Sequence, residues 1–308
     1  MDEEMYTPDE IARLFRISKH TVYELIKRGE LNAIKVGNKM RIEKSELERY
    51  KALRSTMPGR KEEIVAEQWN ESLHIAGSHD FLVEHLIKYI AGQSDFLTVR
   101  PLFVGSLEGL LMLYRGQCDV ACMHLFDPST GEYNLPFIKM FFVLEPLTVV
   151  RLAGREQGLI IAKGNPKEIK GLHDLTRDDI TIVNRQRGSG TRFLLDSFLA
   201  REKISPSDIK GYENEEWNHL SVAAQVSNGK ADCALGIRSA AEQLNLDFIP
   251  ITKENFDLVL HWTPKNEQAL KVLLDIIQLT SFKETVATLE GYDFEEFGKI
   301  IYSNRLEE

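Results

Sequence analysis

From Leu73 onward, short apolar runs with the period of strands alternate with longer runs that have the period of amphipathic helices. LHIAG, LTVRPLFV and DVACMHLF are the first strand-like runs, and FLVEHLIKYI and LEGLLMLYRG are the helix-like runs between them. This alternation predicts an α/β fold with a mostly parallel sheet and helices on both of its faces. Ligands in such sheets bind beyond the carboxyl ends of the strands, where the helices begin.

A second set of strands and helices follows the first. GLIIAKG, ITIVN and ADCALGI are strand-like, LSVAAQVSNG and SAAEQLNL are helix-like, and FDLVLHWTP is an extended run that could cross back to the first set. The helix patterns NEQALKVLLDIIQL and SFKETVATLE are expected to complete the first set. The sequence therefore predicts two lobes within residues 73–308, with the second lobe at about residues 155–255.

The segment RQRGSGTR, residues 185–192, stands directly before the helix pattern FLLDSFL. Backbone N–H groups at a helix N-terminus lack partners, the helix dipole is positive there, and glycines let an anion approach closely. Ser189 and Thr191 add hydroxyl donors. Positive charge comes from Arg185, Arg187 and Arg192. The segment predicts a socket for a small oxyanion; an ordinary Ser or Thr helix cap is the alternative.

Two further turns carry the same residue types. Gly77-Ser78 follows the first predicted strand, and Gly105-Ser106 follows the second. His79 and Asp80 adjoin the first turn and could contribute to the same site. Three histidines fall near predicted strand ends or helix starts and could converge on the cleft: His79, His124 and His219. A hydrogen-bonded structural histidine is the alternative interpretation for each.

The stretch YTPDEIARLFRISKHTVYELIKRG reads as two short helices. Thr7 is an N-cap, Pro8 suits the first helical position, and Glu10 completes a capping box. Ser18 caps the second helix and Gly29 ends it. The residues expected to face the core are Ile11, Leu14, Phe15, Val22, Leu25 and Ile26. Lys19, His20, Tyr23 and Lys27 share the opposite face of the second helix.

In LNAIKVGNKMRIEK, two short strands flank Gly37-Asn38, a two-residue hairpin turn, and Ser45 with Glu48 begins another helix. Residues 1–52 thus predict a winged helix-turn-helix domain, which resembles the excisionase-like branch of the regulators related to the mercury-resistance family. The resemblance implies that the second helix enters the DNA major groove and the wing follows the backbone. The implied DNA-binding residues are Lys19, His20, Tyr23, Lys27, Arg28, Asn38, Lys39 and Arg41. A small helical cap with a solvated charged face is the alternative.

Charge is unevenly distributed along the chain. Of the 38 Lys and Arg and the 47 Asp and Glu, residues 1–60 hold 13 and 10, which leaves 25 and 37 for the rest. Residues 1–60, the head, are mildly basic, and the rest of the chain, the body, is acidic. This distribution predicts that only the head binds a polyanion such as DNA. Residues 53–72, with Pro58-Gly59, read as a linker between head and body.

The N-terminal sequence MDEEMYTPDE is acidic, and no window approaches 18 consecutive apolar residues. We therefore expect neither export nor membrane insertion. The three cysteines, Cys118, Cys122 and Cys233, lie in apolar runs, and an odd number of them fits the reducing cytoplasm. Their spacing matches no zinc pattern, so no metal site and no cofactor are expected.

The body resembles the molybdate-binding-protein-like domain of cytoplasmic regulators, which has the type II periplasmic-binding-protein fold. The segments that carry the resemblance are AGSHD, VGSLEGL, VNRQRGSGTRFLLD, HLSVAAQVSNGKADCALGI and LDFIPITKENFDLVL. The resemblance implies that the three turns converge on the ligand. With the neighbouring groups, the expected ligand-binding residues are Ser78, His79, Asp80, Ser106, Arg185, Arg187, Ser189, Gly190, Thr191, Arg192 and His219.

Together these features predict a one-component transcription regulator that binds a double-stranded DNA operator as a homodimer. It would sense an intracellular oxyanion, molybdate or tungstate, by closure of its lobes. The arginines depart from the neutral pockets of secreted relatives and leave open an enzyme or carrier for a molybdenum-cofactor-like phosphate. We expect no catalytic residues, because the chain has no phosphate-binding lysine loop, nucleophile elbow or zinc spacing. An architectural protein whose body only oligomerises is the third alternative.

Overall fold

The computed structural model describes residues 5–15, 19–27, 31–37, 39–47, 71–93 and 97–305. The chain forms two compact units, Met1–Glu67 and Gln68–Glu308. Most of the predicted linker lies outside the described residues, and its last two residues, 71 and 72, already belong to the first strand of the second unit.

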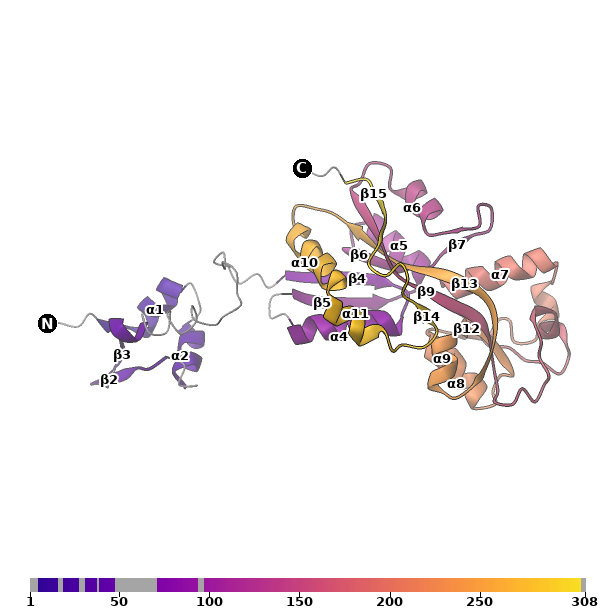
Figure 1. Ribbon diagram of the computed structural model, residues 1–308, viewed down its shortest axis with the longest axis horizontal. Helices are drawn as coiled ribbons and strands as arrows, with labels where there is room; N and C mark the ends of the chain where they lie inside the picture. Colours follow the sequence, from indigo (N-terminus) through magenta and orange to yellow (C-terminus); the bar gives the residue numbers. More distant parts are fainter. Residues whose placement is uncertain are drawn as a thin grey trace. The chain divides into compact units, whose positions relative to one another are not determined.

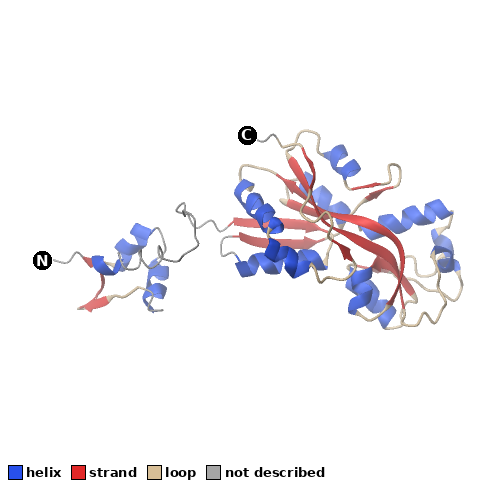
Figure 2. Ribbon diagram, viewed as in Figure 1, coloured by secondary structure: helices blue, strands red, loops and turns tan. Residues whose placement is uncertain are grey.

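The N-terminal unit combines short helices with a three-stranded antiparallel sheet in the order β1-β3-β2 (Figures 1 and 2). Its elements are β1 (Met5–Tyr6), α1 (Pro8–Phe15), α2 (Lys19–Lys27), β2 (Ile34–Val36) and β3 (Lys39–Glu43), and residues 44–47 are helical. β2 and β3 form the predicted hairpin, and Gly37 at its turn has φ of +62°, which glycine adopts without strain. The short strand β1 was not predicted from the sequence.

The predicted capping box opens α1. Thr7 Oγ1 accepts a hydrogen bond from the backbone N–H of Glu10 at 3.2 Å, and Glu10 Oε2 accepts one from the N–H of Thr7 at 2.7 Å. The buried apolar residues of the unit are Ile11, Ala12, Val22, Leu31, Ile42 and Leu47, with Leu25 and Ile26 packed against them. The prediction for Leu14 is wrong: its side chain is 48% exposed, and Ala12 is buried instead. Ser18 and Gly29 lie outside the described residues.

The second unit contains the alternating elements predicted from the sequence and several more (Figure 1). In chain order they are β4 (Glu71–Gly77), α4 (Phe81–Gln93), β5 (Leu97–Phe103), α5 (Ser106–Tyr114), β6 (Val120–Met123), β7 (Phe126–Asp127), β8 (Glu132–Tyr133), α6 (Leu135–Phe141), β9 (Leu147–Ile161), η1 (Leu172–Thr176), β10 (Asn184–Arg185), α7 (Gly190–Glu202), η2 (Pro206–Asp208), β11 (Glu215–Glu216), α8 (His219–Ser227), β12 (Cys233–Ile237), α9 (Arg238–Gln243), β13 (Asp247–His261), α10 (Glu267–Gln278), α11 (Thr280–Val286), β14 (Tyr292–Asp293) and β15 (Ile300–Ser303). None of the helices in the described part of the chain has the length and apolar character needed to cross a bilayer.

The large sheet is mixed, which corrects the prediction of a mostly parallel sheet. Its strand order is β12-β9-β13-β6-β4-β5, with β14 and β15 paired to β9. Only β6, β4 and β5 run parallel, whereas β13 pairs antiparallel with both β6 and β9. The predicted run FDLVLHWTP does cross back to the first lobe, as part of β13. The prediction that ITIVN is a strand is largely wrong, because only a bridge at Ile182 and the short β10 pair there.

Strands β9 and β13 are 15 residues long and run through both lobes (Figure 2). Their register places Arg151 opposite Asp257 and Arg155 opposite Glu254. Both pairs are ion pairs with N–O distances of 2.5 Å, and all four side chains are buried. Opposite charges directly across an antiparallel ladder stabilise the pairing and disfavour a register slip. The two strands that connect the lobes are thus aligned by buried charges.

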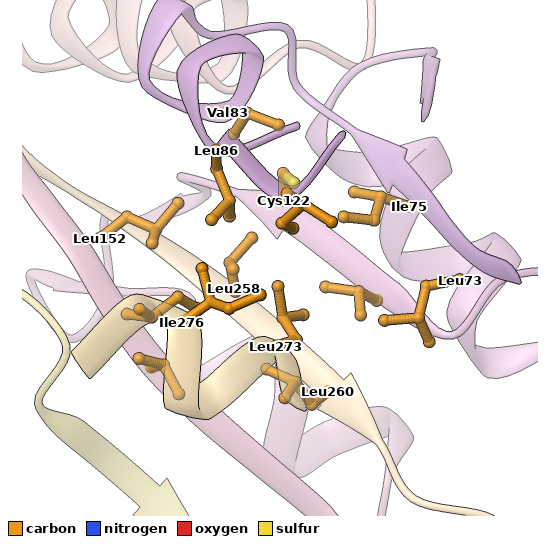
Figure 3. Close-up of a cluster of buried hydrophobic side chains, with 14 of the residues drawn as sticks. Leu73, Ile75, Val83, Leu86, Cys122, Leu152, Leu258, Leu260, Leu273 and Ile276 are labelled. Atoms are coloured by element: carbon orange, nitrogen blue, oxygen red, sulfur yellow. The ribbon is translucent and has the colours of Figure 1, made fainter. Parts of the chain in front are cut away.

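The first lobe packs helices on both faces of its sheet, as predicted. On one face α4, α10 and α11 cover β4, β6, β9 and β13, and Leu73, Leu86, Leu258 and Leu273 point toward one another there (Figure 3). On the other face α5 and α6 pack against Ala76, Ala121 and neighbouring residues. The C-terminal helices therefore complete the first lobe, as the sequence indicated.

The second lobe has two apolar clusters of its own. One packs α7 against β9 and β12 through residues such as Leu159, Leu195 and Leu235. The other packs α8 and α9 on the opposite side of the same strands, with Ile160 and Val222 at its centre. Each lobe thus has apolar clusters of its own, with Phe81 of α4 reaching into the second one, and β9 and β13 run through both lobes.

Candidate anion site and DNA-binding surface

The three predicted turns meet where the lobes touch. Gly105 donates its N–H to the carbonyl of Gly77 at 2.9 Å, and Leu107 donates to the carbonyl of Gly188, in the other lobe, at 3.1 Å. The hydroxyl-bearing residues of these turns are all fully buried: Ser78, Ser106, Ser189 and Thr191. Gly190 and Thr191 are the first residues of α7, so their N–H groups lack intrahelical acceptors.

His124, at the end of β6, ties the first two turns to β13. Its Nδ1 lies 2.8 Å from Glu254 Oε2, its Nε2 lies 3.0 Å from Ser78 Oγ, and its N–H donates to Ser106 Oγ at 3.2 Å. Burial lowers the pKa of His124, so the ring is neutral near pH 7. The carboxylate then accepts from Nδ1–H, and Nε2 accepts from the Ser78 hydroxyl.

A buried arginine on β9 links two carboxylates behind the turns. Arg155 Nη1 lies 2.5 Å from Asp80 Oδ2, and Nη2 lies 2.5 Å from Glu254 Oε1. Asp80 also accepts hydrogen bonds from the hydroxyl of Tyr292 at 3.0 Å and from the N–H of Leu82 at 2.8 Å. The expectation that Asp80 contacts the ligand is therefore corrected: its oxygens are occupied inside the protein, and a carboxylate would repel an anion.

Arg185 is buried, and no carboxylate among the described residues pairs with it. Its Nε donates to Gln186 Oε1 at 3.2 Å and its Nη2 to the carbonyl of Trp217 at 3.1 Å, both neutral acceptors. Its Nη1 has no hydrogen-bond partner within the described part of the chain. Burial, with repulsion from Arg155, lowers the pKa of Arg185 to about 9. A buried cation with an open donor is a group that an anion would stabilise.

Further buried polar atoms on and beside the three turns lack hydrogen-bond partners within the described chain. Both ring nitrogens of His219, the Oε1 atom of Gln157 and the Nδ1 atom of His79 are buried without a partner among the described residues. Burial and the positive charges of Arg185 and Arg155 lower the pKa of His219 well below its usual range. The His124 and His219 rings lie 6.2 Å apart between centroids. Since buried polar groups are nearly always hydrogen-bonded, this cluster is the candidate ligand site.

The other two arginines of RQRGSGTR turn away from this cluster, which corrects the expectation that they contact the ligand. Arg192 stacks on Tyr212 at 4.1 Å and contacts Asp196 and Glu215. Arg187 is exposed and pairs with Glu213 at 3.2 Å. Ser189 is the N-cap of α7 and accepts from the N–H of residue 192, so the cap interpretation also holds for it. His79 bonds to Glu84 at 2.8 Å through Nε2, which leaves its Nδ1 open.

Three residues of the cluster were missed from the sequence: Arg155, Gln157 and Glu254. They lie on β9 and β13, away from the Gly-Ser turns on which the prediction rested. Polar and charged residues inside the apolar run LTVVRLAGREQGLII were the available signal for Arg155 and Gln157, because a buried charge needs a partner or a function. Glu254 stands two residues before the apolar run FDLVLH and had no comparable signal.

The N-terminal unit presents part of the predicted DNA-binding surface. Lys19 and Tyr23 are exposed on one face of α2, and Lys19 Nζ pairs with Asp9 at 2.8 Å. Arg41, on β3, is half-buried and donates from Nη1 to the carbonyl of Met40 at 3.1 Å. His20, Lys27 and Lys39 lie in α2 and β3, and their side chains are not described. Arg28 and Asn38 lie outside the described residues.

Comparison with known families matches both units. A family model described as a helix-turn-helix domain matches residues 5–54, and one described as a PBP superfamily domain matches residues 88–278. YvgK, an uncharacterized protein of Bacillus subtilis, is 37% identical over 302 residues, which cover 96% of this chain and 97% of the relative. The similarity to YvgK therefore includes both units.

Two solved structures resemble the second unit. A substrate-binding protein with bound phosphate from Clostridium perfringens has a TM-score of 0.54 at 15% identity, and the match covers 72% of this chain and 99% of that protein. The tungstate ABC transporter from Geobacter sulfurreducens has a TM-score of 0.51 at 14% identity, over 70% of this chain and 98% of that one. At these identities the likeness establishes the two-lobed fold alone.

Proposed function

Because the chain belongs to the PBP superfamily and carries an N-terminal helix-turn-helix DNA-binding domain, we propose that it is a one-component transcription regulator that senses a small anion. This pair of domains is that of a ligand-sensing regulator or binding protein rather than an enzyme. We place it in the cytoplasm, where its DNA would be accessible. The N-terminal domain binds a double-stranded operator, and the anion binds between the two lobes.

The observation that carries the proposal is the burial of Arg185 with one donor unpartnered. Among the described residues this arginine is a buried guanidinium that contacts only neutral acceptors and keeps one donor open. Hydrogen bonds that involve a charged group are roughly twice as strong as those between neutral groups. An anion bound at Nη1 would therefore offset the cost of burying the charge of Arg185. The hydroxyls of Ser189 and Thr191 and the first N–H groups of α7 supply further donors. Arg185, His219 and these α7 donors form the ligand set that we propose.

Molybdate, tungstate and phosphate are the candidate anions. The resemblance of the segment around RQRGSGTR implies the first two. Among solved structures of similar fold, one holds phosphate and another belongs to a tungstate transporter, which supports phosphate and tungstate as candidates. A molybdenum-cofactor-like phosphate remains the alternative ligand. Such a phosphate would meet Arg185, the arginine of the RQRGSGTR segment whose buried Nη1 has no partner among the described residues.

Signal transfer would follow from lobe closure. The lobes touch through Leu107 and Gly188, and a Cβ atom built on Gly190 would lie 2.4 Å from the carbonyl oxygen of His124. An anion that binds donors from both lobes favours this close approach by its differential affinity for the closed state. In a homodimer, which we also propose, closure would change how two DNA-binding domains meet two half-sites.

Calorimetry on the purified chain tests the anion. We expect one of molybdate, tungstate and phosphate to bind the parent protein, Arg185→Met to abolish that binding, and Arg187→Met to leave it unchanged. Arg187 is the matched control, since it stands two residues away but is exposed and paired with Glu213. Equal loss in both variants, or no loss in either, would remove Arg185 from the site.

A further inference from the structure

We propose that the enclosed ligand is an anion that itself carries an O–H or N–H donor, rather than a fully deprotonated oxyanion. This inference rests on the anion-sensing function proposed above and narrows its ligand class. It follows from the unpartnered acceptors of Gln157 and His219 and from the charges of the buried groups in the candidate site. The chemistry fits a protonated inorganic oxyanion or a hydroxylated carboxylate, which the experiment below separates.

Gln157 provides the first acceptor. Its Nε2 donates to Thr191 Oγ1 at 3.1 Å. The other end of the amide, Oε1, is buried and has no hydrogen-bond partner in the described part of the chain. An oxygen acceptor in this position is satisfied by a donor on the ligand and would repel the bare oxygen of an oxyanion.

His219 provides the second acceptor. Its ring is fully buried at the start of α8, and neither nitrogen has a partner among the described residues. Burial, and then the neighbouring guanidinium groups of Arg185 and Arg155, lower the pKa of this ring and keep it uncharged. A neutral imidazole has one N–H donor and one bare nitrogen acceptor. Its bare nitrogen can therefore accept a hydrogen bond from a donor on the ligand.

The charges of the site agree with the hydrogen bonds. Asp80 and Glu254 both contact Arg155, so two carboxylates face one guanidinium. Arg185 adds one positive charge, and the neutral rings of His124 and His219 add none. The buried groups therefore sum to no net charge, and a dianion would leave two uncompensated negative charges away from water. Each proton that the ligand carries reduces that cost.

Pairs of ligands that differ by one donor test the inference on the unaltered full-length protein. Phosphate and sulfate are tetrahedral anions of similar size, but near neutral pH only phosphate keeps a proton; molybdate and tungstate also keep none. Lactate and propionate share a carbon skeleton and differ by one hydroxyl. We expect calorimetry to show at least about tenfold tighter binding of phosphate than of sulfate, or of lactate than of propionate. The pair that shows this difference tells whether the ligand is an inorganic oxyanion or an organic acid.

Gln157→Met removes the acceptor at nearly constant side-chain length. We expect the preference within the favoured pair to fall about tenfold, through weaker binding of the donor-bearing member. Gln243→Met, on the exposed side of α9, is the control and should keep the preference. Binding of sulfate, molybdate or tungstate as tight as that of phosphate and lactate overturns the inference but keeps the anion-sensing function. An unchanged preference in Gln157→Met also overturns it. If no anion binds, the proposed function itself fails.

Discussion

Replacing Arg185 by Met should make the ligand-free protein more stable while it removes the response to the anion. In the folded protein the pKa of this guanidinium falls well below its usual range, to about 9, first because of burial and then because of Arg155. At about 1.4 kcal/mol per pKa unit, this corresponds to roughly 5 kcal/mol of destabilisation. Below pH 9 the guanidinium is protonated in both the folded and the unfolded protein, so the whole destabilisation is present. The folded protein becomes more stable only as the pH rises above 9, where the folded state begins to lose this proton.

The net gain is smaller than that figure. The Arg185→Met substitution would leave Gln186 Oε1 and the carbonyl of Trp217 without their donor, at a cost of about 1 kcal/mol each. We therefore expect this variant to have a free energy of unfolding about 2–3 kcal/mol higher than that of the parent near pH 7. In a unit of this size that corresponds to an increase in melting temperature of roughly 4–12 °C.

Differential scanning calorimetry of both proteins in an anion-free, non-coordinating buffer measures this gain. Addition of the binding anion should raise the melting temperature of the parent protein by mass action and leave that of the variant unchanged. A variant that melts below the ligand-free parent would refute the reasoning, because it would show that Arg185 contributes to folding rather than being held for a ligand.

Three further predictions test other parts of the account. Gly190→Ala should keep the fold but weaken anion binding at least about tenfold, since its methyl group would meet the backbone of His124; calorimetry checks this, with Gly92→Ala, where nothing lies within 4 Å, as the control. Burial raises the pKa of Glu254, but Arg155 outweighs it and holds this pKa at about 2. The ionised carboxylate therefore contributes about 3 kcal/mol to the free energy of unfolding, which is present above pH 4.5 and lost as the pH falls toward 2. Urea unfolding of Glu254→Gln at several pH values should show that this acid-dependent loss has disappeared, and an unchanged pH profile would contradict it. Arg41→Ala should lower the slope of log affinity against log salt for DNA by about one, and an equal slope would exclude a phosphate contact.

Much of the architecture was readable from the sequence because it rests on local patterns. The capping box of Thr7 and Glu10, the hairpin at Gly37 and the helices of the body follow from residue types at fixed offsets. The turns at Ser78, Ser106 and Ser189 are far apart in the sequence. That they lie together was predicted from the resemblance to the molybdate-binding-protein-like domain, in which these turns surround one ligand.

The polar cluster could be predicted only in part, because it depends on strand register. Arg155 meets Glu254 only because β9 and β13 pair in one alignment over 15 residues, and no local pattern gives that alignment. The three arginines of RQRGSGTR look equivalent in sequence. The structure separates them by direction: Arg185 points into the buried cluster, whereas Arg187 and Arg192 find carboxylates elsewhere.

The central claim is that an anion bound beside Arg185 changes the affinity of this chain for DNA. Its most direct test is fluorescence anisotropy of the full-length protein on DNA selected from a random library, titrated with and without a saturating anion. We predict at least about a fivefold change in DNA affinity for the parent protein and for Arg187→Met, and no change for Arg185→Met. DNA affinity that is the same with and without every anion that binds, or an unaltered response in Arg185→Met, would contradict the account.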